Sequence, residues 1–172
     1  MKRFRHLSFL LLLPFFSCVD QETGDYQLEY RMNLELPADA NPLFTHIFER
    51  DIPSNWREFL AANALKDADI RMVRARSVVM APLLVNPIGY GIFSEAHVSV
   101  YDPNDPNGIL PVGDLYDLSP DVDELVFLPG LADVLPIISQ PEFRMKLALN
   151  LRSIPGSVSE HSVVVRFDVF LN

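Results

Sequence analysis

Residues 27–36 read QLEYRMNLEL, and apolar and polar side chains alternate through the whole stretch. One face carries only polar or charged side chains. The other carries the apolar set, which consists of Leu28, Tyr30, Met32, Leu34 and Leu36. A period of two is typical of a strand with one buried and one solvent-facing side, as in antiparallel sheets. The stretch therefore predicts an antiparallel strand and a mainly β fold.

The same alternation returns twice near the end of the chain. Residues 143–151 and 163–171 both place apolar side chains at every second position. The segment between them, SIPGSVSEHS, has a length typical of a hairpin connection. We therefore expect these two strands to form a β-hairpin.

Weaker alternation predicts further strands at residues 69–80, 92–101 and 122–128. A phase slip near Met72 and Val73 indicates a β-bulge. Pro111 and Gly113 restrict residues 109–118 to a short edge strand, because proline cannot donate to a central ladder. The segment PGLADVLPIIS predicts a short helix or turn.

Residues 40–67, ANPLFTHIFERDIPSNWREFLAANALKD, favour helix instead. Asn41 before Pro42 is a helix-start pattern, and Pro53 followed by Ser54 interrupts one helix and caps a second. The apolar side chains of the first half share a helical face: Leu43, Phe44, Ile47 and Phe48. This segment predicts a helical hairpin or one kinked helix.

Together these patterns predict a mainly β fold over residues 26–172, with a helical insertion after the first strand. An antiparallel β-sandwich of about six to seven strands fits best, either immunoglobulin-like or an open barrel. No period of 20–50 residues repeats. We therefore expect a single domain.

The start of the chain has a different character. Lys2, Arg3 and Arg5 precede an almost wholly apolar run at residues 7–16, and Ser17 and Cys18 follow. A basic start, a short apolar run and a small residue before the cut are typical of a secretory signal. The run is shorter than the roughly 20 residues that a membrane-spanning helix needs. Residues 1–17 are therefore predicted to be a signal peptide.

The stretch LPFFSC resembles the lipobox of bacterial lipoproteins, in the relaxed form found in Bacteroidota. The resemblance implies cleavage before Cys18, a diacylglycerol on its sulfur and a fatty acyl chain, such as palmitate, on its new amino group. The alternative is an ordinary signal peptide with a chance cysteine. Such a peptide needs small residues at both −1 and −3, and Phe15 and Phe16 supply no such pair.

The resemblance also implies an address in the cell. Asp20, Glu22 and Asp25 make residues 18–25 an acidic tether, similar to the surface-export signals of Bacteroidota lipoproteins. A plain solvated linker is the alternative. We expect attachment to the outer membrane, at the cell surface or the periplasmic face. The rest of the chain resembles small β-sandwich lipoprotein domains of unknown function.

Composition excludes several classes of protein. Removing residues 1–17 takes three of the 14 basic residues and none of the 23 acidic ones, which leaves a net charge of −12. Such a chain has no electrostatic reason to bind nucleic acid. Cys18 is the only cysteine, so its modification leaves no thiol for disulfides, zinc sites or nucleophilic catalysis. No cofactor is expected.

Candidate ligand residues are few. Asp102, Asn104 and Asp105 in YDPNDPNG offer oxygen ligands for calcium, but their spacing fails the EF-hand rule and also suits a plain turn. His97 and His161 lack a third metal ligand. We interpret His46, His97 and His161 as surface histidines. The acidic run Asp121, Asp123 and Glu124 is interpreted as a solvated turn.

Aromatic and basic side chains suggest binding surfaces. Trp56, Tyr90 and Tyr101 are candidates for a sugar platform, and Phe93, Tyr101 and Phe170 fall on polar strand faces, where they indicate a second buried face or a partner patch. A basic stripe is possible through Arg74, Arg76, Arg144, Lys146, Arg152 and Arg166. The alternative is ion pairing across strands with Glu29, Glu35, Glu95 and Asp168.

No nucleophile elbow, phosphate loop or catalytic constellation can be assembled from these residues. The sequence therefore favours a membrane-anchored, non-catalytic binding or structural module of the cell envelope, with a protein or another envelope component as partner. The alternative is a carbohydrate-binding or polysaccharide-processing accessory lipoprotein, whose partner is a glycan. A third hypothesis is a calcium-stabilised adhesion-like domain.

Overall fold

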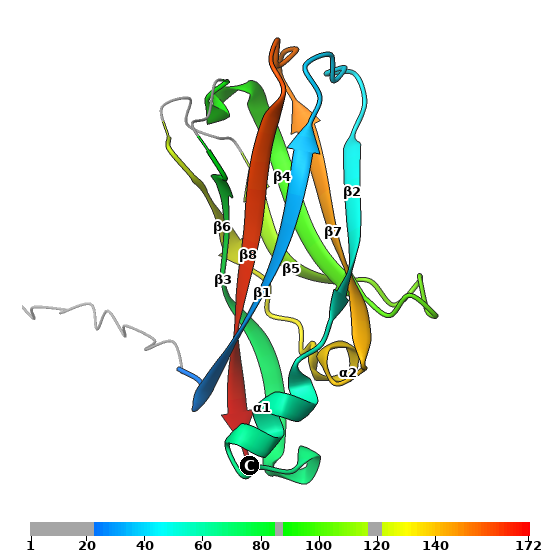
Figure 1. The fold of residues 1–172 in the computed structure, drawn as a ribbon, viewed down its shortest axis with the longest axis vertical. Coiled ribbons are helices and arrows are strands. Elements are labelled where there is room, and N and C mark those ends of the chain that lie inside the picture. The colour runs from blue at the N-terminus through cyan, green and yellow to red at the C-terminus, as the bar shows by residue number, and fades with distance from the viewer. Residues whose placement is uncertain (1–22, 85–87, 117–121) are drawn as a thin grey trace, which may run out of the picture.

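The computed structural model describes residues 23–84, 88–116 and 122–172 and is mainly antiparallel β, as the alternating segments predict (Figure 1). Eight strands form one sheet in the order β1-β8-β3-β6-β5-β4-β7-β2. The strands are β1 Tyr26–Leu36, β2 His46–Pro53, β3 Ile70–Pro82, β4 Phe93–Tyr101, β5 Leu110–Tyr116, β6 Leu125–Pro129, β7 Glu142–Leu151 and β8 Ser159–Leu171. The helices are α1 Trp56–Ala62 and α2 Leu135–Ile138, with 3-10 turns at Asp67–Asp69 and Tyr90–Ile92.

The sheet curls around a common core until its outermost strands, β1 and β2, face each other (Figure 1). β1 pairs with β8, β2 pairs with β7, and β1 and β2 are the two ends of the hydrogen-bonded order. We call the line between them the seam. The open-barrel form of the predicted fold class is therefore confirmed, with eight strands in place of six or seven.

β8 organises one half of this sheet. It pairs with β1 over the whole of β1, from Tyr26↔Val169 to Leu36↔Ser159, and with β3 on its other side. Side chains alternate across a strand, so every second residue of β8 points into the core. The inward set is fully buried and consists of Val163, Val165, Phe167 and Val169.

The helix predicted for the first half of residues 40–67 is wrong. Residues 46–53 are β2, and only the second helix, α1, is present. Apolar residues at this spacing fit a helix face and a strand equally well, and pairing with β7 decides between them. Leu43 and Phe44 lie in a turn in which the Asn41 side chain accepts the Leu43 amide at 2.9 Å.

The hairpin predicted between the last two strands is also wrong. β7 lies between β4 and β2, whereas β8 lies between β1 and β3. The connection therefore crosses from one half of the sheet to the other. Gly156 has φ +75° in this loop, and its amide donates to the carbonyl of Ala38 at 2.9 Å, which ties the loop to the β1–β2 connection.

The predicted bulge in residues 69–80 is confirmed by a register shift between Ile70 and Met72. The edge position predicted for residues 109–118 is wrong, because β5 lies between β4 and β6. A register shift against Val98 and Ser99 accommodates Pro111 there. No helix of the described residues is long and apolar enough to cross a membrane.

Candidate functional surfaces

Exposed apolar side chains gather at one end of the barrel. One group lies on the β1–β2, β3–β4 and β7–β8 connections and at the start of β2, where Leu43 is 85%, Leu84 75% and Phe44 65% exposed. Other exposed apolar side chains, such as Leu128 and Leu131, lie on or beside β6. Figure 1 places these connections together at the top of the molecule, away from the start of β1 and from both helices. We call this surface the apolar end; its members are Leu43, Phe44, Ile47, Leu84, Ile154 and Val158.

The opposite end carries α1, α2 and the C-terminus (Figure 1). Two adjoining hollows of about 280 and 200 Å³ share Trp56, Arg57 and Ser139 as lining residues. Trp56 itself is only 2% exposed, stacks on Phe59 and donates its indole N–H to Asp67 at 2.7 Å. Trp56 is therefore a structural anchor of α1.

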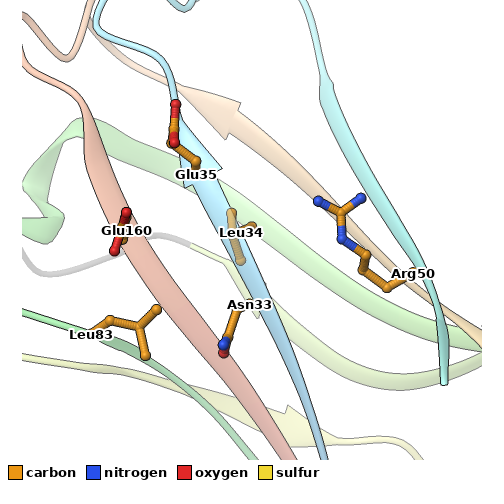
Figure 2. A pocket seen from close by; sticks show the side chains of 6 residues that line it. All are labelled: Asn33, Leu34, Glu35, Arg50, Leu83 and Glu160. Carbon is orange, nitrogen blue, oxygen red and sulfur yellow. The ribbon is translucent and has the colours of Figure 1, made fainter. Parts of the chain in front are cut away.

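A third hollow, of about 280 Å³, lies at the seam (Figure 2). Arg50 reaches from β2 toward β1, where it faces Leu34 and Glu35. Glu160 of β8 is directly opposite Glu35 in the ladder, so two like charges face each other on this rim. The remaining lining residues are Asn33 and Leu83.

The inward face of β2 is incompletely covered. Phe48, Arg50 and Ile52 are opposite Leu147, Met145 and Phe143 of β7, which are all fully buried. Phe48 and Ile52 are nevertheless only half-buried, and Arg50 is exposed. An arginine therefore occupies a core-facing position of a strand at the edge of the sheet.

Charges on the outward face of β2 are neutralised by β7. Arg144 donates to Asp51 at 2.6 and 3.0 Å, and this hydrogen bonding lowers the pKa of Asp51. Lys146 lies 4.0 Å from Glu49. Arg50, in contrast, donates to the backbone carbonyl of Glu49 at 3.1 Å, and no carboxylate of the described residues forms an ion pair with it.

His161 closes the core near the apolar end. It is fully buried, and its ring nitrogens lie 3.0 Å from the Tyr90 hydroxyl and 2.8 Å from the Ser159 hydroxyl. Burial lowers the pKa of His161 to about 4 and raises that of Tyr90. The prediction that His161 is a surface histidine is therefore wrong. The polar sequence SEHS suggested a loop, but β8 already begins at Ser159, and His161 lies on its inward face.

His97 lies on the outer face of β4 and does not join His161. Its Nδ1 lies 2.7 Å from Asp114, and its ring meets Tyr116 edge-on at 5.3 Å. His46 contacts the carbonyl of Asn41 at 2.9 Å. Within the described ranges, no group of three His, Cys, Asp or Glu side chains could hold a metal ion.

The calcium candidates are engaged with their own turn. Asp102 accepts the amide and the side chain of Asn104 at 2.8 and 3.0 Å, and Asp105 accepts the amide of Asn107 at 3.3 Å. These contacts are those of side chains that stabilise consecutive turns. The arrangement favours the plain-turn interpretation over calcium binding.

The aromatic side chains proposed for a sugar platform are buried. Trp56, Tyr90 and Tyr101 are 2%, 0% and 5% exposed, so they have no free ring face for stacking, and that prediction is wrong. Phe93 is also buried, because a register shift beside it turns the ring inward. The fold covers these rings with neighbouring strands and loops that the local pattern does not show.

Tyr101 and Phe170 are buried outside the main core, beneath cations. Arg144 lies over Tyr101, and Arg71 and Arg74 lie 5.7 and 5.3 Å from the Phe170 ring centre. Four of the six residues of the predicted basic stripe form ion pairs across strands, two of them with the predicted partners Glu29 and Asp168. The four pairs are Arg76–Asp168, Arg144–Asp51, Lys146–Glu49 and Arg166–Glu29.

Several sequence predictions lie outside the described residues: the signal peptide at residues 1–17, Cys18, the tether acids Asp20 and Glu22, and Asp121. Asp123 and Glu124 are exposed beside β6. No sequence pattern indicated Arg50 as a candidate, because the side of β2 on which it lies depends on pairing with β7. Leu43 and Phe44 were visible as apolar residues, but the helical interpretation assigned them to a buried face.

No family model matches the chain, and no curated protein does. Solved structures with some similarity include the empty head of turnip yellow mosaic virus and a second structure of that virus. Both are 11% identical and cover 98% of this chain and 91% of the virus chain, with TM-scores of 0.26 and 0.22. Similarity at this level supports no functional argument.

Burial of His161 predicts a pH-dependent stability. Because its folded-state pKa is about 4, against 6.5 in an unfolded chain, the unfolded state binds the extra proton between these values. Stability should therefore fall as the pH drops from 6.5 to 4, by about 3 kcal/mol from this residue. Urea unfolding of the wild type and His161→Gln across this range measures the difference. Identical pH slopes for the two proteins would contradict it.

Proposed function

We propose that this chain is a lipid-anchored, non-catalytic binding module of the bacterial cell envelope, and that the apolar end is its binding surface for an envelope protein. The observation that carries the proposal is the exposure of Leu43 and Phe44 at 85% and 65%. Clustered exposed apolar side chains are costly in water and mark interaction sites. Ile47, Ile154 and Val158, also exposed, extend the surface across neighbouring connections.

The position of this surface relative to the tether argues for a protein partner. From Cys18 to Tyr26 an extended chain spans at most about 29 Å. β1 has 11 residues and rises about 34 Å toward the apolar end. A chain attached at Cys18 therefore cannot stand inverted, with its apolar end pointing straight at the membrane that holds it. The surface faces outward, toward other molecules of the envelope.

In this proposal, the lipid on Cys18 holds the binding module at the membrane. Acyl chains on Cys18 hold the chain at the outer membrane, at either the cell surface or the periplasmic face, because two or more chains give stable attachment. The mature net charge of −12 gives the chain no attraction to anionic headgroups. Attachment thus depends on the lipid.

Replacing the anchor residue should release the protein. We expect Cys18→Ala to abolish incorporation of labelled palmitate and to move the protein from the membrane to the soluble fraction in its host. Ser17→Ala is the matched control, because it keeps a small residue before the cleavage position. Fractionation and labelling of intact cells measure both effects. Undiminished membrane attachment of Cys18→Ala would contradict the lipid anchor.

A photoreactive amino acid should reveal the binding surface. Placed at Phe44 in the full-length protein in living cells, it should give one discrete protein adduct, because that side chain is exposed for a partner. The control position is Arg57, which is exposed at the opposite end on α1. Equal adducts at both positions, or none at Phe44, would remove the apolar end as the binding surface.

A further inference from the structure

The register of β2 against β7 determines which backbone amides and carbonyls of β2 face the seam. The amide of Ser54 donates to the carbonyl of Pro141 at 3.0 Å, and the β2–β7 register places these two residues opposite each other. In an antiparallel ladder such pairs recur at every second residue. Phe48, Arg50 and Ile52 therefore bond to β7. The amides and carbonyls that face the seam belong to Ile47, Glu49 and Asp51, and of these the Glu49 carbonyl accepts a hydrogen bond from the Arg50 side chain.

The inward-facing side chains of β2 are incompletely covered along the same edge. Phe48 and Ile52 face inward but are only half-buried, although their β7 partners Leu147 and Phe143 are 0% exposed. β1, across the seam, has no such deficit, since every second residue from Leu28 to Leu36 is buried. Added apolar side chains would complete the cover of Phe48 and Ile52. The hollow of about 280 Å³ at the seam adjoins Arg50, the residue between them on the same face of β2.

Of the three adjacent charged residues Glu49, Arg50 and Asp51, only Arg50 has no ion-pair partner among the described residues. Glu49 and Asp51 are neutralised by Lys146 and Arg144, but Arg50 has only the carbonyl of Glu49 as a partner among the described residues. Glu35 and Glu160 line the same hollow, so a carboxylate is favoured only directly against the Arg50 guanidinium. A guanidinium binds a carboxylate through two parallel N–H groups. A carboxylate of a bound partner could therefore form an ion pair with Arg50, which no carboxylate of the described residues does.

We propose that an extended segment of the partner protein adds to the free edge of β2 as a further strand, with a carboxylate against Arg50. This rests on the proposed function, because the partner is the protein bound at the apolar end. The two surfaces are continuous through Ile47, which is 56% exposed and lies within β2. Backbone pairing supplies affinity in this mode, and alternate side chains supply specificity.

Arg50 has a competing explanation, which the experiment separates. An inward-pointing charge on an edge strand also protects that edge from pairing with other chains. A glutamate protects the edge as well as an arginine does, but it repels a carboxylate. Arg50→Glu therefore distinguishes a binding residue from a protective one. Arg31→Glu, on the exposed face of β1, controls for the change in net charge.

The test uses full-length protein in living cells, with a photoreactive amino acid at Ile47. Glu49→Pro removes an amide that faces the seam and spares the ladder to β7, whereas Glu49→Ala removes only the side chain. The adduct should persist in Glu49→Ala and Arg31→Glu and be lost in Glu49→Pro. In Arg50→Glu its yield should fall at least about tenfold. Urea unfolding establishes that each variant is folded, and Arg50→Glu is the deciding variant should Glu49→Pro not fold.

The following outcomes would each overturn the proposal of strand addition. An unchanged yield in folded Glu49→Pro would exclude backbone pairing, and an unchanged yield in Arg50→Glu would make Arg50 a protective residue. An adduct of twice the mass of the chain would identify a second copy as the occupant. An adduct at Phe44 without one at Ile47 would refute strand addition while the proposed function stands. Absence at both positions would refute the proposed function as well.

Discussion

Backbone hydrogen bonding to β7 is the constraint from which the rest of the structure follows. β7 lies between β4 and β2, and β8 lies between β1 and β3, so the last two strands of the sequence are both interior strands of the sheet. Each needs partners on two sides because buried amides and carbonyls must be paired. This draws residues 46–53 into a strand against β7. It also leaves β1 and β2 as the ends of the sheet order, and therefore creates the seam.

The two ends of the barrel differ because of what covers them. At the end with α1 and α2, the rings of Trp56 and Phe59 pack beneath the helix, and few large apolar side chains remain exposed. At the other end, short connections join the strands without such a cover. Leu43, Phe44 and Ile154 therefore remain in water, although the Tyr90–His161 contact closes the core beneath them. The tether enters far from this end, which makes the exposed surface suitable for a partner beyond the membrane.

The sequence predicted the fold where its information is local. Alternation identified β1, β7 and β8 because a period of two depends only on the residues of the strand in question. It did not predict that β7 and β8 are separated, because pairing between distant strands depends on the whole sheet. Ile47 and Phe48 fit a helix and a strand equally well until β7 is considered. The core-facing phase of Arg50, the burial of His161 and the cover of Tyr101 by Arg144 are likewise tertiary effects. The lipid anchor at Cys18 stays a prediction from the sequence.

Amide hydrogen exchange can establish whether the edge of β2 that faces the seam is open. In the purified protein, NMR should find the amides of Phe48, Arg50 and Ile52 protected by their bonds to β7. The amides of Ile47, Glu49 and Asp51 should exchange rapidly, because they face the seam without a strand partner. Equal protection of the two sets would mean that β1 and β2 are hydrogen-bonded to each other, and it would contradict the open seam.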